Sequence, residues 1–284
     1  MKRVFANSQN SAEWLQWARE NLERGCDLKD ICHTIRTSGP MCLKLPTTYP
    51  PNNQYLLHPS QAAYDYFHSS QIIPKITRPE GVEDFVRMGN GNFQLFLGVH
   101  FLSHESCELL TEKISSASQQ STLTVPESDK DFRTSMTCHL ASSDDKQVGE
   151  VDAMIAHSLG INSDYSEPIQ GQMYSEGQQF KLHTDYFEPR TEEFKQHANE
   201  KGQRTWTFMI YLSKPNAGGF TYFSALDINI PCDVGTAIAW NNLRSDGSVN
   251  PYSIHEGTKI VSGKKTVITK WFRDKGNGQA FFSR

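Results

Sequence analysis

Residues 203–243 read QRTWTFMIYLSKPNAGGFTYFSALDINIPCDVGTAIAWNNL, in which apolar segments are separated by the turn-forming stretches KPNA and PCDV. Thr, Ile, Tyr, Phe and Trp are frequent in these segments, a composition typical of β-strands. Similar segments occur on both sides, namely RTSMTCHL (residues 133–140), PIQGQMYS (168–175) and KKTVITKWFR (264–273). Many short strands separated by Gly, Pro and Asn predict an antiparallel barrel or jelly roll.

Several helices are expected beside these strands. Residues 93–102, FQLFLGVHFL, are apolar and strand-like, and Ser103 can then cap a helix with Glu105 and Glu108 in its first turns. A second helix is predicted at residues 148–159, and we interpret the polar, charged segment 188–202 as a partly helical lid. The predicted fold class is mainly β with flanking helices (α+β), with a double-stranded β-helix (cupin-like jelly roll) as its core.

The first 92 residues differ in character. Large apolar residues such as Trp14 and Trp17 recur with helical spacing in residues 9–37 and predict two short helices, whereas PTTYPPNNQY at residues 46–55 is typical of an extended connector. Two short helices cannot bury their apolar residues on each other alone. We therefore expect residues 1–92 to form a helical and extended segment packed on the core, and residues 93–284 to form the functional domain.

Composition limits the class of protein. The chain has 284 residues and a net charge of -4, and it shows no basic patch, so we expect no nucleic-acid partner. No apolar run approaches the roughly 20 residues of a membrane helix, and the N-terminus does not resemble a signal peptide, so we expect no membrane partner and a cytoplasmic location. The six cysteines form no CxxC pair, which favours free thiols. The oligomeric state is left open.

The motif His183-Thr184-Asp185 points to metal chemistry. Residues two apart on a strand face the same side, so the imidazole and the carboxylate can meet one ion. His255 precedes the last strand and can supply a third ligand. Two histidines and one carboxylate form the facial triad that leaves one face of iron(II) open. An HxD pair alone is weak evidence for a metal site, because it can arise by chance or serve as an ordinary hydrogen-bonded surface pair.

Lys265 strengthens this interpretation. A dicarboxylate co-substrate that chelates a metal through its 2-oxo acid end needs a cation for its far carboxylate, and a lysine on an inward-facing strand position can supply one. Lys264 and Lys265 face opposite sides of a strand, so only one of them can point inward. We assign that role to Lys265 and expect Lys264 to be a solvated surface charge.

Residues from about 95 to 275 resemble the catalytic domain of prolyl 4-hydroxylases of bacterial type, which are iron(II)/2-oxoglutarate-dependent dioxygenases. The matching pieces occur in the expected order. They are RTS (133–135), EPIQGQMY (167–174), GQQFKLHTDYF (177–187), RTWTFMIYLS (204–213), GGFTYF (218–223), GTAIAWNN (235–242) and HEGTKIVSGKKTVITKWF (255–272).

The resemblance implies an oxidoreductase that hydroxylates an unactivated C–H of proline or a proline-like amino acid, free or peptidyl, and releases succinate and CO2. It implies that His183, Asp185 and His255 hold Fe(II) and act in catalysis, and that Lys265 binds the distal carboxylate of 2-oxoglutarate. The resemblance also implies O2 as a co-substrate and L-ascorbate as an optional reductant. The substrate partner is then a small amino acid or a peptidyl-proline segment.

Other family positions are carried over one by one. Tyr174 and Thr221 match positions that contact the distal carboxylate of 2-oxoglutarate, and Trp271 matches a tryptophan near the active site. The resemblance therefore implies that these three residues bind the co-substrate. Plain packing of the barrel would explain these three residues as well. Arg133 and Tyr186 match substrate-side positions.

Some positions depart from the family pattern, without removing a ligand. Phe220 replaces an acidic residue, Ser224 a proline, Thr266 a tryptophan, and Lys259-Ile260 a proline-valine pair. These differences concern the identity of the substrate. Alternatives that remain are a non-catalytic cupin-type binding module and a dioxygenase of this family that acts on an unrelated small molecule. A nucleic-acid demethylase and a zinc hydrolase are disfavoured by the acidic charge balance and by the missing HExxH motif.

Overall fold

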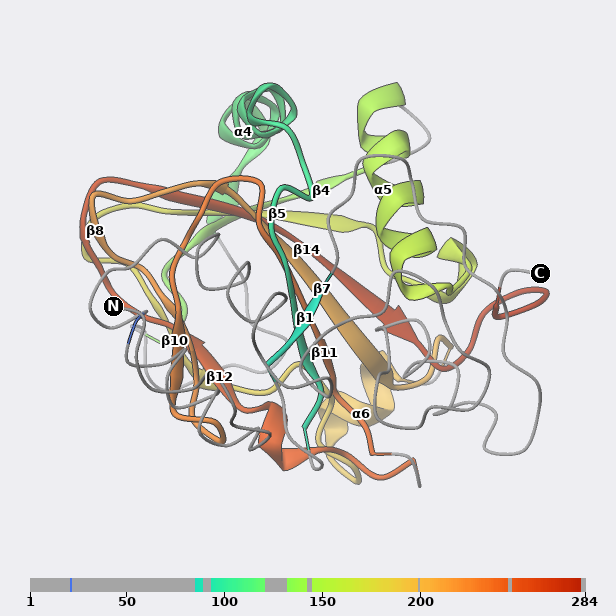
Figure 1. The fold of residues 1–284 in the computed structure, drawn as a ribbon. Helices are drawn as coiled ribbons and strands as arrows, with labels where there is room; N and C mark the ends of the chain where they lie inside the picture. The colour runs from blue at the N-terminus through green and yellow to red at the C-terminus, as the bar shows by residue number, and fades with distance from the viewer. Residues whose placement is uncertain are drawn as a thin grey trace, which may run out of the picture.

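The computed structural model describes residues 21, 85–88, 93–120, 132–141, 145–198, 200–244 and 247–281. Apart from Asn21, the N-terminal helices and the connector expected from the sequence lie outside these ranges. The described part contains a large and a small antiparallel sheet with helices beside them (Figure 1). This arrangement confirms the predicted jelly roll with flanking helices.

In the described part of the chain the larger sheet has eight strands, all paired with antiparallel neighbours. Its two longest strands, β7 and β14, lie side by side near its centre, and their Thr, Ile, Phe and Trp residues are buried on both faces. Strands buried on both faces favour such residues. In spatial order the strands are β1 (Val86–Arg87), β2 (Leu95–Gly98), β11 (Ala237–Asn241), β7 (Arg204–Ser213), β14 (Lys265–Arg273), β5 (Ile169–Tyr174), β4 (Met136–Leu140) and β3 (Gln119–Gln120).

Among the described residues the smaller sheet has four strands, and a separate ribbon has two. The segment GGFTYFSALDINI, expected to be strand-like, is divided among three short strands, because Gly218, Gly219 and Asp227 take positive φ angles and turn the chain. The sheet order is β10 (Ile228–Ile230), β9 (Thr221–Phe223), β12 (His255–Gly257) and β6 (Phe180–His183), and the ribbon pairs β8 (Ala217–Gly218) with β13 (Ile260–Ser262).

The helices begin at side chains that cap them. Helix α4 (His104–Ala117) follows Ser103, whose hydroxyl accepts from the Ser106 backbone N–H at 3.1 Å, as predicted. Helix α5 (Lys146–Leu159) begins two residues before the expected start because Asp145 caps it, and it ends at Gly160 with φ 68°.

The described residues also contain one short α-helix and two 3-10 turns. Helix α6 (Glu192–His197) occupies part of the predicted lid segment 188–202. Two 3-10 turns, η2 (Ser163–Tyr165) and η3 (Pro251–Ser253), precede β5 and β12. Among the described residues no helix combines the length and apolarity needed to cross a membrane.

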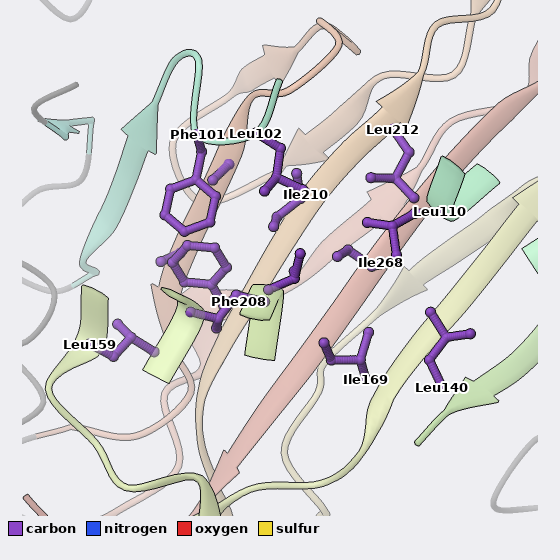
Figure 2. Packing of buried hydrophobic residues seen from close by; sticks show 14 of the residues in the cluster. Phe101, Leu102, Leu110, Leu140, Leu159, Ile169, Phe208, Ile210, Leu212 and Ile268 are labelled. Carbon is purple, nitrogen blue, oxygen red and sulfur yellow. The ribbon is translucent and has the colours of Figure 1, made fainter. Parts of the chain in front are cut away.

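Two hydrophobic clusters lie on opposite faces of the large sheet. Helices α4 and α5 cover one face, where Leu110 and Leu159 meet Phe208, Ile210 and Ile268 from β7 and β14 (Figures 1 and 2). Burial of each such side chain stabilises the fold by about 1.5–3 kcal/mol. The second cluster fills the space between the two sheets and surrounds the candidate site described below.

The large sheet extends N-terminally of residue 93. Strand β1 pairs with β2, and the neighbouring side chains of Phe85 and Met88 are fully buried. The packing of residues 1–92 on the core remains a prediction. Of the six cysteines, Cys107, Cys138 and Cys232 are described, and each is a buried free thiol, as expected.

Candidate active site

Three potential metal ligands converge at one end of the small sheet. His183 ends β6 and His255 begins β12, and these two residues are direct cross-strand partners. Asp185 follows His183 by two positions, so its carboxylate lies on the same side. One ligand atom from each residue lies within 4.8 Å of the other two. Nε2 of His183 is 3.9 Å from Oδ1 of Asp185, and Nε2 of His255 is 4.0 Å from Oδ2.

Backbone carbonyls orient both imidazoles. Nδ1 of His183 lies 2.8 Å from the Lys181 carbonyl oxygen, and Nδ1 of His255 lies 2.9 Å from that of Ser253. A carbonyl only accepts, so each Nδ1 carries the proton and each Nε2 keeps its lone pair for a metal. Burial, aided by the nearby His255, lowers the pKa of His183 to about 3, so this ring is neutral at neutral pH.

Asp185 is buried and held at both its carboxylate and its backbone. Thr207 on β7 donates to its Oδ2 at 2.6 Å, and an Arg204 guanidinium nitrogen donates to its backbone carbonyl at 3.3 Å. Burial would raise the pKa of Asp185, but the two imidazoles and Arg204 outweigh it and hold the pKa below its usual range. The carboxylate is therefore ionised and available to a cation.

A buried lysine lies in the same cavity as the triad. Lys265 begins β14, is 3% exposed, and pairs across the sheet with Tyr174 on β5. Its ammonium donates to the Gly219 carbonyl at 2.8 Å. Lys264, one position earlier, is exposed. The predicted strand register is thus confirmed, with Lys265 inward and Lys264 outward.

Hydroxyl and amide groups surround Lys265. Tyr174 donates to the side-chain oxygen of Gln172 at 2.9 Å, and Tyr211 donates to the Thr221 hydroxyl at 2.8 Å. Thr221 and Tyr174 are buried and line the cavity together with Lys265. A small dianion bound here would meet one cation and several hydroxyl groups, which is a suitable environment for a carboxylate.

The cavity joins the triad to Lys265. Alternate residues of β14, from Lys265 through Val267 and Thr269 to Trp271, face it, as strand geometry requires. Trp240 also lines it and contacts the His255 ring edge-on at 4.8 Å between centroids, whereas Trp206 packs in the other hydrophobic cluster. Further lining residues are Gln172, Phe180, Met209 and Gly257.

The two residues matched to substrate-side positions lie beside the cavity. The Arg133 guanidinium is 4.8 Å from the centroid of the Phe180 ring, which in turn stacks on His183 at 3.5 Å. Arg133 donates to Ser135 and Gln170, both uncharged. Tyr186 directly follows Asp185 and is buried, but neither it nor Arg133 is among the lining residues.

An ionic network supports the wall behind Trp271. Glu167 accepts from Arg204 at 2.6 Å and from Arg273 at 2.5 Å. The Arg204 guanidinium also lies 4.0 Å from the Trp271 ring centroid. Burial alone would raise the pKa of Glu167, but the two arginines outweigh it and hold the pKa at about 2. This network fixes Arg204, which contacts Asp185.

The donor set fits iron(II). Two imidazoles and one carboxylate provide nitrogen and oxygen ligands of the facial-triad type, and these three residues line one cavity. Lys265 lines the same cavity as the three ligands. No other group of three or more metal-ligating residues of this kind occurs among the described residues.

Comparison with known proteins identifies the family. Residues 169–273 match the 2OG-Fe(II) oxygenase superfamily. A probable prolyl 4-hydroxylase 3 of Arabidopsis thaliana is 30% identical over 199 residues, which are 62% of this chain and 68% of the plant protein. The chain belongs to the prolyl 4-hydroxylase-like 2-oxoglutarate/iron(II) oxygenases. This oxygenase is therefore a dioxygenase that uses Fe(II), 2-oxoglutarate and O2.

Other relatives extend this result. Prolyl 4-hydroxylase subunit alpha-2 of Gallus gallus is 30% identical over 146 residues, but these are 51% of the oxygenase and only 27% of the chicken protein. The crystal structure of the viral collagen prolyl hydroxylase from Paramecium Bursaria Chlorella virus-1, a 2OG complex, aligns with a TM-score of 0.50 at 21% identity, over 64% of the oxygenase and 95% of the viral chain. This structure supports the fold.

Membership in this family removes two of the alternatives. A non-catalytic cupin-type module and a zinc hydrolase do not agree with relatives that are prolyl hydroxylases. The roles of the individual site residues remain predictions, as does the substrate. Thr207, Tyr211 and Arg204 lie in the matched segments but received no role from the sequence.

Proposed function

We propose that this oxygenase hydroxylates an unactivated C–H of proline or a proline-like amino acid, free or peptidyl. One turnover consumes 2-oxoglutarate, O2 and R–H and yields succinate, CO2 and R–OH. The observation that carries this proposal is that a His-Asp-His cluster and a buried lysine line one cavity. Family relatives named as prolyl 4-hydroxylases support the choice of proline.

The chain's residues divide the binding task. His183, His255 and Asp185 would hold iron(II), which when bound couples the oxidative decarboxylation of 2-oxoglutarate to hydroxylation of the substrate. Lys265 would bind the far carboxylate of 2-oxoglutarate. Its ammonium presently donates to the Gly219 carbonyl, and it can rotate its remaining N–H donors toward a carboxylate.

Tyr174 and Thr221 would assist Lys265. The pKa of Tyr174 is raised, chiefly by burial, so the phenol stays protonated, and it would turn its single proton from Gln172 to a bound carboxylate. The Thr221 hydroxyl accepts from Tyr211, which directs its own proton away from Tyr211 and toward the cavity it lines. Trp271 and Trp240 would exclude water from the space above the metal ligands.

Arg133 is proposed to contact the substrate. Burial lowers its pKa, and its hydrogen-bond partners among the described residues are uncharged. A partly buried guanidinium with neutral partners retains the capacity to bind a carboxylate or a peptide carbonyl. Tyr186, next to Asp185, is proposed as a second substrate-side residue. We propose that the substrate partner is an amino acid or a peptidyl-proline segment.

The proposal is tested with purified protein supplied with Fe(II), 2-oxoglutarate and ascorbate. L-proline, L-pipecolate and a proline-rich peptide are added separately, and succinate and oxygenated product are measured by mass spectrometry. We expect one class to give product in a one-to-one ratio with succinate. If 2-oxoglutarate is decarboxylated but no proline compound gains oxygen, the substrate assignment is wrong and the alternative of an unrelated small molecule stands.

A further inference from the structure

The metal-ligand carboxylate has one oxygen already engaged. Oδ2 of Asp185 accepts the hydroxyl proton of Thr207 at 2.6 Å, and both residues are buried, with Thr207 fully inaccessible. Hydrogen bonds from a hydroxyl to a carboxylate are short and strong when water is excluded. Oδ1, which faces Nε2 of His183, has no such donor among the described residues.

Asn242 fixes the direction of the Thr207 hydroxyl. Its side-chain nitrogen donates to Oγ1 of Thr207 at 2.9 Å. A hydroxyl that accepts on one side has a single proton left to give, so this proton points at Asp185. Asn242 is itself held, because its backbone N–H donates to Thr205 and its carbonyl accepts from Asn250.

We infer that Thr207 is a positioning residue that keeps Asp185 a monodentate metal ligand. This inference rests on the proposed function. With Oδ2 engaged by Thr207, Oδ1 is the oxygen that accepts no hydrogen bond among the described residues and is the preferred donor to the metal. Three protein ligands then leave three positions of an octahedral ion free, which is the number that a chelating 2-oxoglutarate and O2 require. A bidentate carboxylate would occupy one of those positions.

Partners that orient metal ligands change metal affinity by about 10–100-fold when they are removed. Replacing Thr207 by the isosteric valine deletes the donor and frees both carboxylate oxygens. Thr207→Ser retains a hydroxyl and serves as the conservative rescue. Thr207→Ala gives a second deletion that introduces no branched side chain.

The same strand offers a matched control. Thr205 lies two positions before Thr207 on β7, is 1% exposed, and its hydroxyl has no hydrogen-bond partner among the described residues. Thr205→Val therefore makes the same chemical change at the same depth without removing a bond. It tests whether loss of a buried hydroxyl from β7 is by itself sufficient to weaken the site.

The experiment titrates metal-free protein with Mn(II) alone and follows free Mn(II) by electron paramagnetic resonance, so no turnover is needed. Thermal unfolding checks that each variant is folded. A second titration adds 2-oxoglutarate to protein saturated with Mn(II). We expect Thr207→Val and Thr207→Ala to raise the Mn(II) dissociation constant on the order of 10–100-fold and to weaken 2-oxoglutarate binding. Thr207→Ser and Thr205→Val should bind both as the wild type does.

Two results would overturn the inference. One is wild-type affinity for Mn(II) and for 2-oxoglutarate in folded Thr207→Val and Thr207→Ala. The other is an equal loss in Thr205→Val, which would mean a general effect on the strand. If instead the wild type binds no Mn(II), or His183→Ala binds it equally well, the proposed metal site fails and the inference fails with it. The control titrations therefore separate the two failures.

Discussion

Lys265 is a buried cation whose hydrogen-bond partners among the described residues are the Gly219 carbonyl and the Cys232 thiol side chain, and neither carries a formal counter-charge. The rings of Tyr174 and Tyr211 lie 5.6 and 5.5 Å from its ammonium, at centroid distances. The site thus holds one positive charge that a bound dicarboxylate would neutralise. We predict that Lys265→Ala greatly raises the 2-oxoglutarate requirement of the enzyme.

The magnitude follows from burial. Removing one member of a buried, hydrogen-bonded ion pair costs about 3–5 kcal/mol, because the other charge is left without a partner. Since each 1.4 kcal/mol or so is a factor of ten, the KM for 2-oxoglutarate should rise by roughly 100-fold to a few thousand-fold. Lys264 is exposed, so its removal should leave the KM unchanged.

The assay measures succinate release against 2-oxoglutarate concentration for the wild type, Lys265→Ala and Lys264→Ala. Thermal unfolding without 2-oxoglutarate serves as the folding control. Lys265→Met should be at least as stable as the wild type there, because a buried charge without a counter-charge is replaced by an apolar chain of similar length. An unchanged KM in Lys265→Ala, or a large rise in Lys264→Ala instead, would refute the assignment and place the strand register one residue away.

Three further predictions concern other parts of the site. His183→Ala should abolish turnover and metal binding while the melting temperature of the metal-free protein changes little, and retained activity would contradict the triad. Tyr211→Phe deletes the bond to the Thr221 hydroxyl and should raise the KM for 2-oxoglutarate by a few-fold to about tenfold, as expected for one hydrogen bond of about 1 kcal/mol. The pKa of Glu167 is about 2 in the folded protein, and its ordinary value is 4.5. The ionised carboxylate therefore stabilises the fold by about 3 kcal/mol above pH 4.5, and this contribution is lost as the pH falls toward 2. Denaturant titrations should therefore show less acid loss of stability between pH 4.5 and 2 in Glu167→Gln, and parallel curves for the two proteins would argue against this.

Local sequence rules predicted the parts of the fold that depend on neighbouring residues. Ser103 caps α4 because its hydroxyl reaches a backbone N–H three residues on. The inward direction of Lys265 followed from strand alternation once Lys264 was assigned to the surface. The same alternation could have identified Thr269, four positions after Lys265, as a cavity residue.

Contacts between distant strands were beyond these rules. The bond from Thr207 to Asp185 joins residues 22 positions apart, and the bond from Asn242 to Thr207 joins residues 35 apart. The first depends on β7 facing the small sheet, and the second depends on β11 lying beside β7, so both require the strand order. The sequence shows Thr207 only as one of several strand threonines. Thr205, two positions earlier, has no hydroxyl partner in the part of the chain that the structure describes, so composition alone does not distinguish the two threonines.

The central claim is that one cavity holds a metal on His183, Asp185 and His255 and the far carboxylate of 2-oxoglutarate on Lys265. The most direct test is a crystal structure of the protein soaked with Mn(II) and 2-oxoglutarate under anaerobic conditions. The account predicts one ion bound to both Nε2 atoms and to a single Asp185 oxygen, with the co-substrate extending to the Lys265 ammonium. An ion bound elsewhere, or a 2-oxoglutarate whose far carboxylate lies away from Lys265, would contradict it.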